Sequence, residues 1–125
     1  MSRQAEFQGK QVWVTGAGQG IGYQTALAFH QAGAEVTGFD LKFDQQDYPF
    51  RCQLLDVADP KQVAEICQNL LTRQPRLDVL INAAGILRIG ATDALTFNDW
   101  QQCLNVNAGG AFNLFQQTLP VFRRQ

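Results

Sequence analysis

The sequence lacks several features on which whole classes of protein depend. Its three cysteines lie at positions 52, 67 and 103, and with a single histidine, His30, they show neither a disulfide framework nor the spacing of a zinc site. No apolar run approaches the roughly 20 residues that span a bilayer, and the polar residues 1–11 lack the hydrophobic core of a signal peptide. We therefore expect a cytoplasmic protein with no metal site and no membrane partner.

Charge is also scarce. Only 17% of the residues are charged and the formal net charge is -1, against the roughly 25% charged residues of average globular domains. Because nucleic-acid binding depends on a basic surface, we do not expect a nucleic-acid partner. The 125 residues, 46% of them hydrophobic, are enough for one modest domain with a buried core.

The most informative segment that is present is the glycine-rich run at residues 15–22, which follows an apolar stretch and precedes a helical pattern. In that position Gly16 permits a sharp turn, Gly20 lets the backbone approach a pyrophosphate, and Gly22 lets the helix pack closely. The Lys-Ser/Thr pair of a P-loop is missing, which favours a nicotinamide dinucleotide over a nucleoside triphosphate. The candidate cofactor-binding residues of this run are Gly16, Gly18, Gln19, Gly20, Ile21 and Gly22.

Short apolar segments alternate with helical patterns along the chain. Strands are predicted at residues 11–15, 35–39, 52–55 and 77–81. Helices are predicted at residues 20–31, with Gly33 as the stop signal, and 60–72, with Asp59 as N-cap. Residues 41–51 lack helical periodicity and are predicted to form a loop. This alternation predicts an α/β fold with a parallel sheet.

A last, long helix is predicted from a capping box at Thr96 and Asp99 as far as Phe122. Its apolar residues recur at helical spacing, which favours a core position for the stripe around Phe112, Phe115 and Phe122, although a partner is an alternative. Asn107 lies on this apolar stripe, and an amide there is either a hydrogen-bonded core residue or a positioned functional group.

Asp40 closes the second predicted strand, where an acidic residue after a glycine-rich βα unit binds the ribose hydroxyls of a dinucleotide. Its carboxylate would repel a 2′-phosphate, which favours NAD over NADP. Lys42 is the one nearby cation that argues for NADP. The alternative role for Asp40 is to cap its own turn.

Polar turns follow the third and fourth predicted strands, at Asp56-Val57 and at residues 82–85, at the sheet edge where doubly wound folds bind ligands. With the glycine run, these turns resemble the short-chain dehydrogenase/reductase family. The resemblance implies a Rossmann-type sheet of strand order 3-2-1-4 with flanking helices, and an oxidoreductase that uses NAD. The roles that it implies are adenine contact for Asp56 and Val57, lining of the cofactor groove for Asn82, Ala83 and Gly85, and support of a proton-relay water for Asn107.

Further stretches resemble, over nearly the whole chain, family members that oxidise a dihydrodiol carboxylic acid to a catechol in siderophore biosynthesis. They lie at residues 20–23, 38–40, 48–50, 85–88, 90–93 and 109–117. The implied substrate is therefore a small carboxylic acid. Arg88, just past Gly85, is a candidate partner for its carboxylate, and a solvated or interface arginine is the alternative.

The family's catalytic serine, tyrosine and lysine have no counterparts in this sequence. Its only serine is Ser2, and Leu27 and Cys52 stand where the lysine would follow Tyr23 and Tyr48. We therefore expect residues 1–125 to be the N-terminal NAD-binding part of a single dehydrogenase domain, truncated before strand five and inactive alone. The family further implies a homo-oligomer, a tetramer, with the long helix at the subunit interface. The alternative is a noncatalytic nucleotide-binding or dimerisation module.

Overall fold

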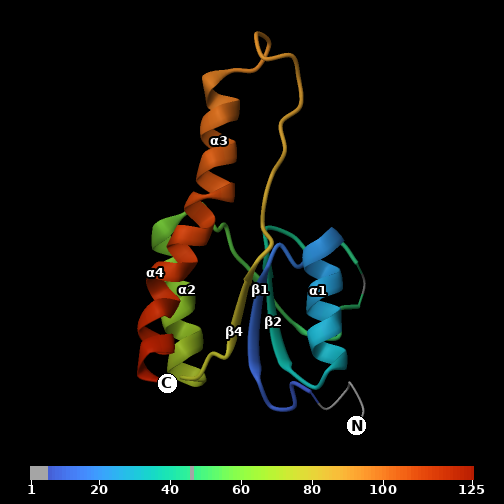
Figure 1. The fold of residues 1–125 in the computed structure, drawn as a ribbon, viewed down its shortest axis with the longest axis vertical. Helices are drawn as coiled ribbons and strands as arrows, with labels where there is room; N and C mark the ends of the chain where they lie inside the picture. Colours follow the sequence, from blue (N-terminus) through green and yellow to red (C-terminus); the bar gives the residue numbers. More distant parts are fainter. Residues whose placement is uncertain (1–5, 46) are drawn as a thin grey trace.

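The structure is a computed structural model that describes residues 6–45 and 47–125. Four parallel strands, β1 (Gln11–Thr15), β2 (Glu35–Asp40), β3 (Arg51–Leu54) and β4 (Val79–Asn82), form a sheet in the order β3-β2-β1-β4. Helix α1 (Gly20–Gln31) covers one face, and α2 (Pro60–Arg73) and α4 (Gly109–Arg124) cover the other (Figure 1). Helix α3 (Phe97–Asn107) extends beyond the sheet beside an extended segment (Figure 1). The predicted Rossmann-type fold and strand order are confirmed.

The two faces of the sheet bury separate apolar clusters. On one face Trp13 packs edge-on against Phe39, with ring centroids 5.3 Å apart, in a cluster that includes Leu114 of α4. On the other face Val12 and Val14 pack with residues of α1. Because helices cover both sides, the middle of β1, Val12 to Val14, is a continuous buried apolar run instead of alternating with polar residues. No helix within residues 6–45 and 47–125 combines the length and apolar character needed to cross a membrane.

For the majority of the strand ends, the predicted boundary differs from the observed one by one or two residues. Strand β2 ends on Asp40, and β4 begins at Val79 because Leu77, although fully buried, precedes the paired residues. Helix α2 begins as predicted: the Asp59 carboxylate accepts hydrogen bonds from the backbone N–H groups of Lys61 and Gln62 at 3.1 and 3.2 Å.

The predicted long helix is wrong in one respect, because it consists of two helices that meet at Ala108. The predicted capping box is present at the start of α3, where Thr96 and Asp99 exchange hydrogen bonds of 3.0 and 3.1 Å. The junction directly precedes Gly109 and Gly110, and glycine pairs are frequent sites of helix kinks. A Cβ at Gly110 would lie 2.7 Å from Cγ2 of Val57, so Gly110 lets α4 approach the loop between β3 and α2 closely.

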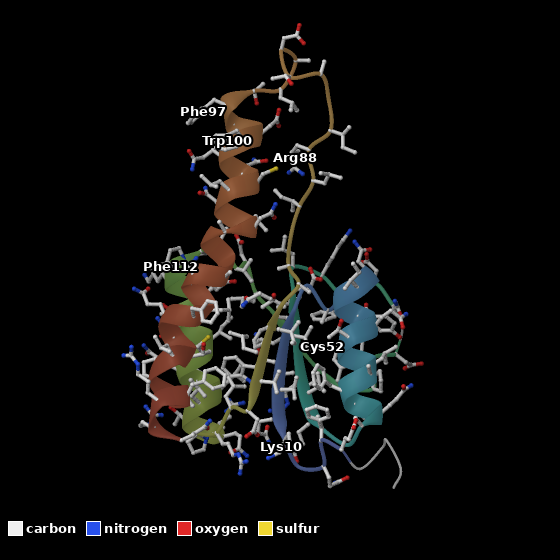
Figure 2. The ribbon with its side chains drawn as sticks, in the orientation of Figure 1. Lys10, Cys52, Arg88, Phe97, Trp100 and Phe112 are labelled. Carbon is white, nitrogen blue, oxygen red and sulfur yellow. The ribbon has the colours of Figure 1, made fainter. Side chains whose placement is uncertain are left out.

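The predicted core stripe is also wrong for most of its members. Phe112 and Phe115 are 61% and 53% exposed, while Phe122 alone of that group packs against the core. Figure 2 shows Phe97, Trp100 and Phe112 directed away from the sheet. The buried side of α4 carries Gly110, Asn113, Leu114, Thr118 and Val121. The spacing of apolar residues predicted the wrong face of α4 because the face that is buried includes a polar residue, Asn113. The Nδ2 of Asn113 donates a hydrogen bond to the Val57 carbonyl oxygen at 2.8 Å.

Candidate functional site

The carboxyl edge of the sheet brings most of the predicted cofactor residues together. The strand register places Thr15 beside Phe39 on one side and Asn82 on the other. The glycine run that follows β1 therefore lies between Asp40, at the end of β2, and the turn at residues 82–85 after β4. These three segments form the candidate site.

Thr15, which had no predicted role, ties two of these segments together. Its side chain is fully buried, and its Oγ1 accepts hydrogen bonds from the backbone N–H groups of Ala83 and Ala84, both at 3.1 Å. The available sequence signal is a hydroxyl directly after the apolar run Val12 to Val14. This contact fixes the turn after β4 against the end of β1.

Two glycines make the turn after β1 compact. Gly16 has a φ of 66°, and a Cβ there would lie 2.8 Å from the carbonyl carbon of Ala83. A Cβ at Gly22 would lie 2.0 Å from the carbonyl oxygen of Gly16. Both distances are too short for a side chain, so the glycine run packs against the turn after β4 and the first turn of α1 packs against the glycine run.

The N-terminus of α1, in contrast, is open. A Cβ at Gly20 would meet no atom within 4 Å, and Ile21 is 82% exposed. The N-cap Gln19 makes no capping hydrogen bond through its side chain, and the first turn has no acidic residue. Free N–H groups at a helix N-terminus attract anions. This opening therefore fits the diphosphate group of a dinucleotide.

Asp40 lies partly buried beside the glycine run. Its Oδ2 accepts a hydrogen bond from the Gly18 N–H at 2.8 Å, and its Oδ1 accepts one from the Leu41 N–H at 2.7 Å. The second bond is the turn cap considered as an alternative role. Because a carboxylate has about four acceptor positions, it retains capacity for ribose hydroxyls. Lys42 forms an exposed ion pair with Asp44, with an N···O distance of 3.4 Å.

Asp56 and Val57 have structural contacts in the loop between β3 and α2. The Asp56 Oδ1 accepts from the Ala58 N–H at 3.0 Å, and Val57 is buried against α4. The Asp56 side chain remains partly exposed. These contacts hold the loop in place. The contact of Asp56 and Val57 with the adenine of a cofactor stays a prediction.

Asn107 is exposed, which rules out the buried core amide considered from the sequence. Its Oδ1 accepts from the Ile86 N–H at 2.8 Å, and its Nδ2 donates to the Ile86 carbonyl at 3.1 Å. A Cβ at Gly85 would lie 3.2 Å from Asn107 Oδ1, so the two approach closely. Asn107 therefore anchors the extended segment after β4 to the end of α3.

Arg88 lies on that extended segment beside α3, beyond the sheet edge (Figure 2). It is exposed, and its Nη2 donates to the Gln102 Oε1 at 3.1 Å. A guanidinium has five N–H donors, so this contact leaves Arg88 able to bind a carboxylate.

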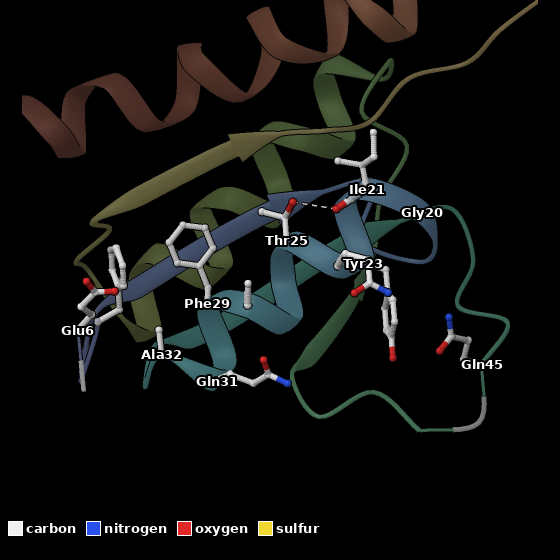
Figure 3. Close-up of a pocket in the computed structure, with 12 residues that line it drawn as sticks. Glu6, Gly20, Ile21, Tyr23, Thr25, Phe29, Gln31, Ala32 and Gln45 are labelled. Carbon is white, nitrogen blue, oxygen red and sulfur yellow. Dashed lines mark hydrogen bonds between the residues drawn. The ribbon is translucent and has the colours of Figure 1, made fainter. Parts of the chain in front are cut away.

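A hollow on the outer side of α1 is separate from most of the candidate site. Its lining includes Phe7, Tyr23, Thr25, Phe29 and Gln45, and it shares only Gly20 and Ile21 with the glycine run (Figure 3). Among residues 6–45 and 47–125, no cluster of three or more His, Cys, Asp or Glu side chains is arranged to hold a metal ion. Burial raises the pKa of the Cys67 thiol to about 12 and keeps it protonated.

Comparison with known proteins relates this geometry to one family. The sequence matches the family model described as short chain dehydrogenase over residues 10–125. It is 66% identical over 120 residues to 2,3-dihydro-2,3-dihydroxybenzoate dehydrogenase of Escherichia coli K12, an alignment that covers 96% of this chain and 48% of that relative. The chain spans about half the length of the curated relatives it matches.

Solved structures show the same relation. A short-chain dehydrogenase from Leptospira borgpetersenii with bound NAD+ superposes with a TM-score of 0.92 at 28% identity, covering 99% of this chain and 50% of that chain. The ligand-free aldohexose dehydrogenase of Thermoplasma acidophilum superposes with a TM-score of 0.90 at 26% identity, covering 97% of this chain and 47% of that chain.

Proposed function

The chain belongs to the short-chain dehydrogenase family, and from this premise we propose that it is the cofactor-binding part of an NAD-dependent dehydrogenase. The observation that carries the proposal is the open N-terminus of α1 next to the Asp40 carboxylate. The helix N-terminus offers N–H donors to a diphosphate, and the carboxylate offers acceptors to a neighbouring ribose. The two groups are thus suited to adjacent parts of one dinucleotide.

NAD is preferred over NADP in this proposal because Asp40 adjoins the glycine run. A 2′-phosphate would face a carboxylate there, and like charges repel. Lys42, which argues for NADP, is paired with Asp44. That pair is exposed and therefore weak, so the preference depends on Asp40 and not on the neutralisation of Lys42.

The proposed substrate is 2,3-dihydro-2,3-dihydroxybenzoate, on the strength of the 66% identity to the E. coli dehydrogenase that bears this name. Bound NAD would supply the hydride acceptor for the carbinol carbon of this substrate, and loss of the hydroxyl proton with tautomerisation would give the aromatic catechol. Arg88 would bind the substrate carboxylate, and Asn107 would hold the segment that carries Arg88 through its bonds to Ile86.

The chain's own contribution is to bind and orient the two reactants. The family's proton-accepting tyrosine and its lysine have no counterpart in this sequence, so we propose that residues 1–125 bind the cofactor without turnover. The exposed apolar side of α3 and α4 would form the subunit contact of a cytoplasmic homo-oligomer, a tetramer.

The test is a titration of the purified chain with NAD, followed by addition of 2,3-dihydro-2,3-dihydroxybenzoate. We expect saturable NAD binding without formation of NADH, with the E. coli dehydrogenase as the positive control for turnover. No NAD binding would refute the cofactor role. NADH formation would instead refute the proposal that the chain lacks a catalytic group.

A further inference from the structure

One phenol connects the loop between β2 and β3 to the glycine run. The Tyr48 hydroxyl donates a hydrogen bond to the Gly18 carbonyl oxygen at 2.8 Å and accepts one from the Gln45 N–H at 3.1 Å. On its other side, Gly18 donates its N–H to Asp40 Oδ2 at 2.8 Å. Both backbone polar groups of Gly18 are thus held by side chains that lie 22 and 30 residues further along the chain.

Gly18 has almost no freedom to move away from these contacts. It is buried, and a Cβ there would lie 2.5 Å from the Lys42 carbonyl oxygen and 2.8 Å from Asp40 Oδ2. The end of β2 and the loop after it therefore enclose Gly18 tightly. The loop and the carboxylate that we assign to the ribose therefore both contact Gly18.

The Tyr48 ring is itself held by neighbouring aromatic rings. It packs edge-on against Phe43, Tyr23 and Phe50 at centroid distances of 5.0, 5.6 and 5.6 Å. Tyr23 belongs to α1, and Phe50 is buried against Gly38 of β2. Edge-to-face contacts of this kind are favourable and fix ring orientation. The hydroxyl therefore reaches Gly18 from a rigid base.

We propose that Tyr48 is a positioning residue for the adenosine half of the cofactor, an inference that rests on the proposed NAD binding. Its hydroxyl fixes the peptide groups of Gly18, and Gly18 in turn fixes the Asp40 carboxylate where the ribose binds. A site that is already ordered loses less conformational entropy when its ligand binds. Without the hydroxyl, the buried Gly18 carbonyl loses its partner and the loop loses its tie to the glycine run.

The variant Tyr48→Phe removes this hydroxyl and keeps the ring, and Tyr23→Phe is the matched control. Tyr23 lies in the same aromatic cluster, and its hydroxyl makes no hydrogen bond to residues 6–45 or 47–125. Calorimetric titration with ADP-ribose should show affinity about three- to tenfold weaker in Tyr48→Phe, the loss of one net hydrogen bond. Tyr23→Phe should bind like the unmodified chain.

A second readout separates positioning from a general loss of structure. Because the hydroxyl acts through Asp40, Tyr48→Phe should also reduce the preference for ADP-ribose over 2′-phospho-ADP-ribose, and amide exchange at Gly18 should accelerate. An unchanged ADP-ribose affinity, equal effects in both variants, or a Tyr48→Phe chain that unfolds while Tyr23→Phe stays folded would each overturn the inference. Failure of the unmodified chain to bind ADP-ribose would instead overturn the proposed NAD site.

Discussion

Replacing Gly20 with alanine should separate cofactor binding from folding. The backbone of Gly20 has a φ of 61°, and no atom lies within 4 Å of a Cβ placed there. An L-residue in this left-handed conformation costs about 1–2 kcal/mol, and no steric clash adds to that. At roughly 4 °C per kcal/mol, the melting temperature should fall by about 4–8 °C and the chain should remain folded.

Cofactor binding should suffer more, because the new methyl group points into the opening that we assign to the diphosphate. Hydrogen bonds to a charged group contribute about 1.5–3 kcal/mol each. Loss of even one such bond weakens NAD binding at least about tenfold. Gly20→Ala should therefore bind NAD at least about tenfold more weakly while retaining a cooperative unfolding transition.

Gly9 provides the matched control for this experiment. Its φ is 75° and a Cβ there also meets no atom within 4 Å, but it lies in the turn before β1, at the opposite end of that strand from the glycine run. Gly9→Ala should lose similar stability and bind NAD normally. Calorimetric titration and thermal unfolding of both variants provide the measurements. Equal loss of NAD affinity in the two, or normal NAD affinity in Gly20→Ala, would refute the assignment of the opening.

Three further predictions address charge. Asp40→Arg should shift preference from NAD towards NADP by at least about tenfold, and unchanged discrimination in binding titrations would contradict the ribose role. Arg88→Ala, measured in a catalytically active dehydrogenase that carries these 125 residues, should raise KM for the carboxylate substrate and leave NAD affinity unchanged, whereas unaltered kinetics would exclude the substrate role. Burial raises the pKa of Asp78, but the hydrogen bond from the Gln11 N–H and the neighbouring Arg76 outweigh it and lower the pKa below 3.8. The stability that this carboxylate contributes is therefore present above that value and lost as pH falls through the lower folded-state pKa. Urea unfolding midpoints should show a smaller acid dependence in Asp78→Asn, and identical pH profiles would contradict it.

Local signals account for what the sequence predicted well. Alternating apolar segments and helical patterns sufficed for the four strands and for α1 and α2, and side-chain caps at Asp59 and Thr96 marked helix starts. The strand order came from the family resemblance, because periodicity alone does not order strands.

Contacts between distant residues account for what the sequence missed. The buried face of α4 depends on Val57, which approaches Gly110 and accepts a hydrogen bond from Asn113 across the fold. The Thr15 hydroxyl meets its partners 68 and 69 residues away, and the Tyr48 hydroxyl meets Gly18 30 residues away. Spacing along the chain does not reveal such pairs.

The central claim is that an NAD site lies at the carboxyl edge of the sheet, between the glycine run and Asp40. Its most direct test is to titrate the isotope-labelled chain with NAD and follow the backbone amide resonances. The account predicts saturable shifts concentrated at residues 16–22 and at Asp40 and Leu41. Shifts confined to Thr25 and Phe29 in the hollow on the outer side of α1, or no saturable shift at all, would contradict it.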